Sequence, residues 1–216
     1  MNGCLNGRIR LILAFDSATK YCSVALYCEG EILEQTDPAP HGHASQLMPM
    51  IDDILSRADS TISQVEAIVV SLGPGSFTGI RIGISTALGL ASALDIPVYG
   101  VSSLRARSFL DHSTVCPLID ARRDRVYAAC YGQFELEETN LPFEDLLAHI
   151  KHHEVIFTGE EVDEFGHRAG VAVIENDHYA KGAIQAYLAG DFTENIEPRY
   201  LRLTQAEAEV RGLASP

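Results

Sequence analysis

The sequence has little positive charge. Its 16 lysine and arginine residues are outnumbered by 30 aspartate and glutamate residues, which gives a formal net charge of -14. Proteins that hold a nucleic-acid backbone by themselves rely on clustered lysine and arginine. We therefore expect that this chain does not bind nucleic acid on its own.

The chain also lacks the cysteine spacing of a metal site. It has five cysteines, and no two of them form a Cys-x-x-Cys pair. They are Cys4, Cys22, Cys28, Cys116 and Cys130. An odd number without ligand spacing predicts small buried thiols in a reducing compartment, without disulfides or a bound metal.

No stretch is apolar for long enough to predict a membrane span. Only a short apolar run follows Arg8 and Arg10, which is not the pattern of a signal peptide. Residues 82–94 are the most apolar later stretch, but glycine, serine and threonine interrupt them, and they fall short of the ~20 residues that a span needs. We therefore expect a cytoplasmic protein without membrane contact.

Familiar nucleotide-binding and catalytic motifs are absent from the glycine-rich segment at residues 72–83, LGPGSFTGIRIG. It is not a P-loop, a complete Gly-x-Gly-x-x-Gly or a Gly-x-Ser-x-Gly nucleophile elbow. Because an apolar run at 67–70 precedes it, the segment predicts a turn from a buried strand to a helix, which Thr78 could cap. Such a turn either presents N–H groups to a phosphate or is simply a tight connection.

The order of the predicted elements repeats. We predict strands at 9–15, 22–27, 32–35, 67–70, 98–101, 113–120, 126–131, 134–136, 155–157 and 171–174, and helices at 44–58, 78–94, from 102 or 103, at 143–152 and at 179–188. Asp16 and Asp120 each come at the end of the first strand of a half. The sequence therefore predicts an α/β fold of two duplicated subdomains, 1–111 and 112–216. Each has a three-stranded antiparallel hairpin unit extended by parallel strands and packed by helices, and the C-terminal segment can pack back on the first subdomain.

The predicted helix at 78–94 is apolar nearly all round. One stripe contains Ile80, Ile84, Leu88 and Ala91, and a second contains Ile82, Gly83, Ala87, Leu90 and Leu94. Such a helix needs cover on both sides, and its own sheet supplies one. The other cover is either the interior of the same domain or another subunit, which the small Gly83 and Ala87 would allow to approach closely.

Paired hairpins with a terminal aspartate resemble the superfamily of actin, the sugar kinases and the heat-shock chaperone ATPases (ASKHA). In its active members the two hairpin turns hold the nucleotide phosphates and a metal. The resemblance thus implies that Asp16, Thr19, Ser23 and Asp120 could hold Mg-ATP. The match is imperfect, because Ala18 stands where a glycine is common and no Gly-Gly adenosine segment is evident in the second half.

A closer resemblance runs through nearly the whole chain. Besides residues 72–83, the matching segments are LAFDSAT at 13–19, CSVAL at 22–26, HASQLMP at 43–49, IPV at 96–98, GVSSL at 100–104, DARR at 120–123, VY at 126–127 and PRYLR at 198–202. In this order they resemble the TsaB (YeaZ) family, bacterial partner proteins in making threonylcarbamoyladenosine on tRNA.

The TsaB resemblance implies a non-catalytic subunit of the ASKHA fold. It would pair, through its two first-half helices, with a paralogue that transfers the threonylcarbamoyl group to the adenosine beside the anticodon, and would form a homodimer when alone. An ATPase and a threonylcarbamoyl-AMP synthase complete the pathway, and tRNA is reached only through the complex. The interface candidates are Leu47, Met48, Ile82, Gly83, Thr86, Ala87, Gly89 and Leu90. The candidates for binding ATP or ADP, with the subunit interface as one location, are Asp16, Thr19, Gly75, Ser76 and Asp120.

The histidines agree with a non-catalytic interpretation. The transferase paralogue is expected to bind its metal with a helical His-x-x-x-His pair, whereas His41 and His43 are two residues apart and would point to different helix faces. We predict no metal and no catalytic residue.

The alternative is an ATP-dependent phosphotransferase or ATPase, based on Asp16, Asp120 and the glycine-rich segment. The older metallopeptidase label of relatives is weak without the histidine pair.

Overall fold

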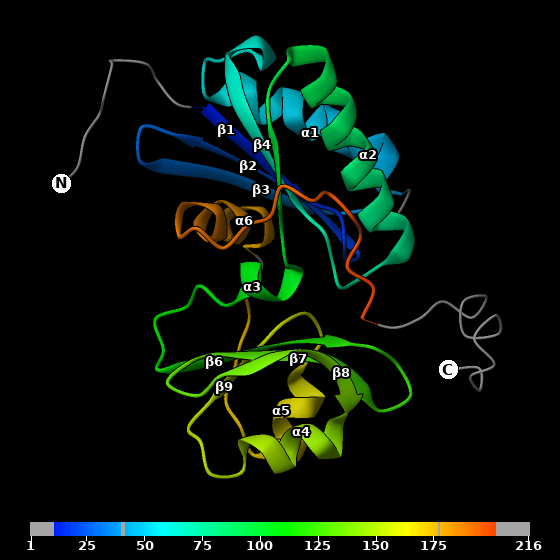
Figure 1. Ribbon diagram of the computed structural model, residues 1–216, viewed down its shortest axis with the longest axis vertical. Coiled ribbons are helices and arrows are strands. Elements are labelled where there is room, and N and C mark those ends of the chain that lie inside the picture. Colours follow the sequence, from blue (N-terminus) through cyan, green and yellow to red (C-terminus); the bar gives the residue numbers. More distant parts are fainter. Residues whose placement is uncertain (1–10, 40–41, 177, 202–216) are drawn as a thin grey trace.

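The computed structural model describes residues 11–39, 42–176 and 178–201. They form two subdomains, one above the other in Figure 1. The first half of the chain contains β1 (Leu11–Asp16), β2 (Tyr21–Cys28), β3 (Glu31–Pro38), α1 (His43–Arg57), the 3₁₀ turn η1 (Ile62–Gln64), β4 (Val65–Ser71), α2 (Phe77–Leu94), β5 (Val98–Val101) and α3 (Ser103–Arg107). The second half contains β6 (Thr114–Asp120), β7 (Arg125–Gly132), β8 (Leu136–Pro142), α4 (Phe143–Ile150), β9 (Ile156–Thr158), α5 (Asp163–Ala169), β10 (Val173–Ile174) and α6 (Tyr179–Leu188).

The two sheets have the same strand order, which confirms the duplication predicted from the sequence. The order is β3-β2-β1-β4-β5 in the first sheet and β8-β7-β6-β9-β10 in the second. In both sheets the central strand pairs antiparallel with its hairpin neighbour and parallel with the strand that follows a helix. The fold is therefore α/β, with two copies of one unit.

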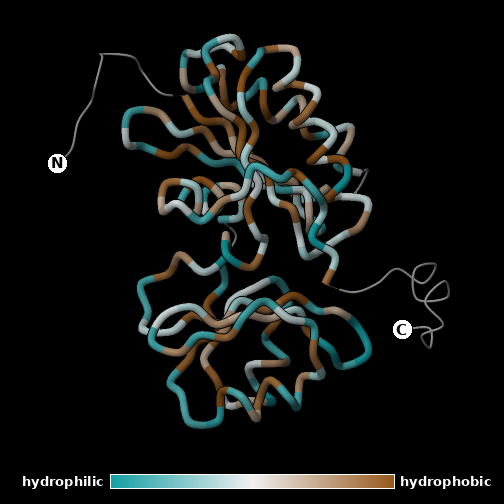
Figure 2. Tube along the Cα trace, viewed as in Figure 1, coloured by the Kyte–Doolittle hydropathy of each residue, from teal (hydrophilic) through white to brown (hydrophobic). Residues whose placement is uncertain are grey.

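Helices cover both faces of the first sheet, so β1 is buried on both sides. Leu13 and Phe15 face a core shared with α1 and α2, whereas Ile12 and Ala14 face a second core shared with α6. Side chains alternate between the faces of a strand, so a strand with two apolar neighbours must be apolar throughout. Figure 2 shows hydrophobic residues along the strands and hydrophilic residues in many of the loops.

In the second sheet, α4 and α5 cover one face. Cys116, Leu118 and Phe157 pack there with Phe143 of α4 and Phe165 of α5. The strands β6 and β7 also contact α3, which links the two subdomains. The second sheet thus has its own small core and meets the first subdomain through a short helix.

The helix α6 comes from the second half of the sequence but packs on the first sheet, against β1 and β2, and on α3. Gly182 permits this close approach, because a Cβ there would lie 1.8 Å from the carbonyl oxygen of Ala106. One layer of the first subdomain is therefore supplied by the C-terminal half of the chain.

Most of the predicted helices and strands are confirmed, two of them to the residue: β5 and α6. Ser102 caps α3, because its hydroxyl accepts the Leu104 N–H at 3.1 Å. The N-terminal start of the first strand lies outside the described residues.

Two local expectations were wrong: the cap of α2, and the strand predicted at 134–136, which the structure has as β8 at Leu136–Pro142. Ser76 rather than Thr78 caps α2, since its hydroxyl accepts the N–H of Gly79 at 3.2 Å. Met50 is buried together with the apolar residues of α1, so the buried face of this helix is wide. The short helix α5 forms in an acidic segment that has too few apolar residues to show a helical period.

Ion pairs connect the two subdomains at the mouth of the junction between them. The Lys20 ammonium, in the turn after β1, lies 2.6 Å from a Glu161 carboxylate oxygen and 3.1 Å from one of Glu160, both of which follow β9. We call these three residues the ionic latch. At another point of the junction, Arg199 pairs with Glu138 of β8 at 3.1 Å.

The ionic latch predicts a pH-dependent contribution to stability. Through their hydrogen bond, Lys20 holds the pKa of the Glu161 carboxyl below its usual range. The pair therefore stabilises the folded chain when Glu161 is ionised, and the contribution is lost as the pH falls through the lowered pKa. We expect Lys20→Met to lower the melting temperature by ~1–3 °C at neutral pH and to have a smaller effect at acidic pH, where Glu161 becomes protonated.

The control is Lys151→Met, at the exposed end of α4, where no ion pair occurs among the described residues. This variant should melt like the unaltered chain at both pH values. An equal loss for Lys20→Met at both values would show that the latch does not act through charge.

Candidate functional site

The glycine-rich segment between β4 and α2 lies directly on the turn between β1 and β2. The Ser76 N–H donates to the Ala18 carbonyl oxygen at 2.6 Å, and the Ser17 hydroxyl donates to the Gly79 carbonyl oxygen at 2.8 Å. The two backbones are in contact, and the segment covers the first hairpin turn.

Two glycines of the segment are needed for this contact. A Cβ at Gly79 would lie 1.8 Å from the carbonyl oxygen of Ser17, and a Cβ at Gly75 would lie 2.3 Å from that of Ala18. Real Cβ atoms do not approach so closely, so any larger residue would push the turn away. The glycine pattern is thus explained by backbone packing.

The structure brings together only part of the candidate nucleotide site. Asp16 is 1% exposed, and one of its oxygens accepts the Ala18 N–H at 2.8 Å. Gly75 and Ser76, in the glycine-rich segment, lie against the turn between β1 and β2. In that turn the Thr19 hydroxyl accepts the Tyr21 N–H at 3.1 Å. Asp120 is the last residue of β6, just before the second hairpin turn, and pairs with Arg122 at 3.1 Å.

Ser23, another residue that the ASKHA resemblance implies, already has hydrogen-bond partners within the chain. Its hydroxyl lies 2.8 Å from that of Thr36 and accepts the N–H of Ala180 in α6 at 3.2 Å. Asp16 is buried with one carboxylate oxygen that has no hydrogen-bond partner, and the glycine-rich segment covers the turn, so nucleotide binding by these residues stays a prediction.

Neither the histidines nor the cysteines form a metal site in the part of the chain that is described. The ring of His43 hydrogen-bonds to the carbonyl oxygen of Thr19 at 2.8 Å, and His41 lies outside the described residues. The described cysteines are free thiols. Burial, with a smaller contribution from nearby carboxylates, raises the pKa of Cys22 to about 12, which makes it unreactive.

The outer face of α2 exposes apolar residues, next to the polar Arg81, Ser85 and Ser92. Phe77 and Leu88 are 41% and 46% exposed, and a Cβ at Gly89 would meet nothing within 4 Å. Ile82, Thr86 and Leu90 are half-buried beside them, and Met48 of α1 is 39% exposed. We call these residues of α1 and α2 the helical face.

Three of the interface candidates are not on the helical face. Leu47 and Ala87 are fully buried in the first core, and a Cβ at Gly83 would lie 2.6 Å from the Ser17 hydroxyl oxygen. The expectation that they offer contact to a partner is corrected, because their side of each helix faces the sheet. In the second stripe predicted for α2, Gly83 and Ala87 face the sheet, whereas Ile82 and Leu90 are half-buried.

By length and composition alone, α2 is apolar enough to cross a membrane, and a third of its 18 residues are buried. Core helices of soluble proteins pass the same test, so the helix by itself does not indicate a membrane. The informative point is the combination of apolar composition and incomplete cover, which is typical of a helix that packs against another molecule.

A small aromatic cluster borders the helical face at the start of α2. Phe77 stacks on Tyr200, with ring centroids 5.1 Å apart, and the Arg81 guanidinium lies 3.9 Å from the centre of the Phe77 ring. The Arg81 Nε–H donates to the Tyr200 hydroxyl at 3.0 Å. The C-terminal segment is thus fixed to the first turn of α2.

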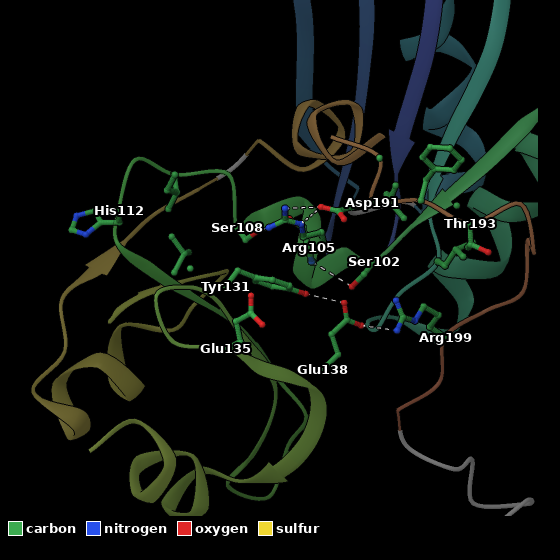
Figure 3. A pocket seen from close by; sticks show the side chains of 18 residues that line it. Ser102, Arg105, Ser108, His112, Tyr131, Glu135, Glu138, Asp191, Thr193 and Arg199 are labelled. Atoms are coloured by element: carbon green, nitrogen blue, oxygen red, sulfur yellow. Dashed lines mark hydrogen bonds and ion pairs between the residues drawn. The ribbon is translucent and has the colours of Figure 1, made fainter. Parts of the chain in front are cut away.

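A cleft of about 740 Å³ lies between the subdomains, and Figure 3 shows its polar lining. The Tyr131 hydroxyl donates to Glu138 at 2.9 Å, and Glu138 pairs with Arg199. Burial and, to a lesser extent, Glu138 raise the pKa of Tyr131. Arg105 pairs with Asp191 at 2.6 Å. These side chains pair with one another across the cleft. We call them the brace, because they connect β7, β8 and α3 to the segment at residues 189–201.

Sequence reasoning did not identify the residues of this brace. Arg199 belongs to the PRYLR segment, which was noted only as a resemblance. Arg105, Tyr131 and Glu138 lie far apart in sequence and follow no motif, so only the fold reveals that they meet.

Comparisons with known proteins agree with this architecture. The family model for TsaD, tRNA N6-adenosine threonylcarbamoyltransferase, matches residues 37–193. A Pseudomonas aeruginosa crystal structure described as an uncharacterized protein with similarity to peptidase YEAZ superposes with a TM-score of 0.74 and 32% identity, over 89% of this chain and all of that one. A structure of YeaZ from Pseudomonas aeruginosa gives 0.71 and 30%, with the same coverage. The duplicated actin-like fold defines the class.

Within that class the sequence relatives are more specific. The Escherichia coli tRNA threonylcarbamoyladenosine biosynthesis protein TsaB is 30% identical over 93% of this chain and 98% of its own length. The Bacillus subtilis protein of the same name is 31% identical over 92% and 96%. The chain therefore belongs to the TsaB (YeaZ) family.

The contact between the glycine-rich segment and the first turn generates a prediction about stability. We expect Gly79→Ala to lower the free energy of unfolding by ~3 kcal/mol or more, because its methyl group would overlap a backbone oxygen that cannot move alone. Gly89→Ala, in the same helix but in open space, should raise it by ~0.5–1 kcal/mol. Urea unfolding of the isolated chain measures both. A tolerated Gly79→Ala would show that the segment does not depend on this contact.

Proposed function

We propose that this chain is a non-catalytic partner subunit for the threonylcarbamoylation of the adenosine next to the anticodon of tRNAs. It binds and activates a transferase paralogue of the same fold through the helical face. Family membership supports the pathway, because the relatives are named for tRNA threonylcarbamoyladenosine biosynthesis. The observation that carries the mode of action is the exposed apolar side of α2.

The fold also supports the choice of partner. The family model of the transferase matches most of this chain, so a transferase of that family presents helices equivalent to α1 and α2. Two such helix pairs can pack face to face about a two-fold axis, and two copies of this chain can do the same. We therefore propose that a homodimer forms through this surface when the partner is absent, and that the partner replaces one copy.

The covered first turn supports the non-catalytic part of the proposal. A phosphotransferase of this superfamily would need open hairpin turns on both sides of its cleft, whereas here the glycine-rich segment lies on one of them. Activation then occurs by stabilising one conformation of the transferase. The pathway ATPase and the tRNA join the complex of the two paralogues, and the net charge of -14 agrees with a tRNA held mainly by other subunits.

A charge on the helical face should abolish pairing without unfolding the chain. Gly89→Arg adds a long cationic side chain in open space, and in an apolar interface it would be buried without a partner. We expect the affinity for the transferase to fall at least ~100-fold and the homodimer to become a monomer. Light scattering of the chain, alone and mixed with the transferase, measures both.

His149→Arg, on the exposed side of α4, is the matched control and should pair normally. A Gly89→Arg chain that still pairs would place the interface elsewhere. An unaltered chain that pairs with no transferase, or that alone hydrolyses ATP, would contradict the proposed function itself.

A further inference from the structure

The second hairpin turn, residues 121–124 between β6 and β7, has an unusual backbone. Arg122, Arg123 and Asp124 have φ angles of 67°, 56° and 58°, so three successive residues with side chains are left-handed. This conformation is unfavourable for residues other than glycine, and strain of this kind concentrates at functional sites. The equivalent turn of the first subdomain makes the reversal without it.

The surrounding structure holds the turn in place. Asp120 accepts the Arg122 N–H at 2.7 Å, and the Asp124 carboxylate pairs with Arg168 of α5. The Asp124 carbonyl oxygen accepts the N–H of Phe143 at 2.9 Å. Both flanks of the turn are thus fixed, and the arginine side chains are presented by a rigid support.

The two arginines point into solvent. The side chain of Arg122 is 82% exposed and forms an ion pair with Asp120. Arg123 is exposed and has no ion pair within the described ranges. In the first subdomain the glycine-rich segment covers the corresponding turn, whereas the fold leaves this one open. The charge of Arg122 also makes a small contribution to the lowered pKa of Glu161 in the ionic latch.

The chemistry of the turn favours phosphate over a protein surface. Guanidinium groups hold phosphate oxygens with paired hydrogen bonds, and here two of them project from adjacent positions of one turn. The exposed residues of the turn are charged, and the core of a protein interface needs apolar side chains, which are found on the helical face instead. Two adjacent exposed arginines on an acidic chain suit a local contact to an RNA that other subunits hold.

We propose that the turn at residues 121–124 contacts the phosphodiester backbone of the tRNA bound to the complex, through Arg122 and Arg123. This assignment rests on the proposed function. It gives the acidic subunit a direct role in positioning the RNA, beyond pairing with the transferase.

The test measures tRNA affinity as a function of salt concentration. The full chain is combined with the transferase, and an unmodified substrate tRNA is titrated at several salt concentrations with Arg122→Gln, Arg123→Gln and the double variant. Each lost phosphate contact should reduce the slope of log K against log salt by ~0.7–0.9, and the double variant by about twice that. Lys151→Gln, an exposed cation on the same subdomain, should leave the slope unchanged.

Arg123→Gly separates binding from folding. Glycine accepts the left-handed backbone, so this variant should raise the melting temperature of the isolated chain while it weakens tRNA binding. An unchanged salt slope in an intact complex would overturn the proposal. So would loss of transferase pairing in the glutamine variants, which would indicate a protein contact, or weakened binding of ATP with tRNA binding intact. A failure of the unaltered chain to pair, seen by light scattering, would instead remove the proposed function first.

Discussion

The contact between two backbones, that of the glycine-rich segment and that of the first hairpin turn, determines much of the structure. Ser17 and Ala18 hydrogen-bond to the start of α2, and the glycines allow the helix to sit directly on the turn. Because the inner side of α2 is fixed in this way, its outer side has a defined direction. The same turn contains Lys20 of the ionic latch. Residues 17–20 therefore contact α2 at one end and the second subdomain at the other.

The fold was largely predictable because duplication repeats the signal. An apolar strand, a terminal aspartate and a hairpin occur twice with similar spacing, and each copy strengthens the interpretation of the other. The helical face was predictable only in outline. Apolar residues all round α2 showed that two covers are needed, but periodicity alone could not decide that Gly83 and Ala87 face inward while Gly89 faces outward. The brace around Tyr131 had no local signal, because its members meet only in three dimensions.

The two hairpin turns have diverged although the two sheets have one topology. The first turn is covered by backbone and buries Asp16, while the second is exposed, left-handed and carries two arginines. In a symmetric cleft both turns would face one ligand. Here the covered turn serves the packing of α2, which leaves the exposed turn free for a different contact. Duplication followed by divergence therefore explains how one small chain can present two unlike surfaces.

The net charge of -14 is compatible with the helical face and the exposed second turn acting on different partners. In the proposed function a net charge of -14 repels RNA at long range, so the transferase holds most of the tRNA. An apolar helical face is unaffected by that repulsion and can pair with the transferase before the RNA arrives. The proposed RNA contact of Arg122 and Arg123 would then act only at short distance, where the two guanidinium groups can reach phosphate oxygens directly. In the proposed function the two surfaces therefore have separate tasks, protein pairing for the helical face and RNA contact for the exposed turn.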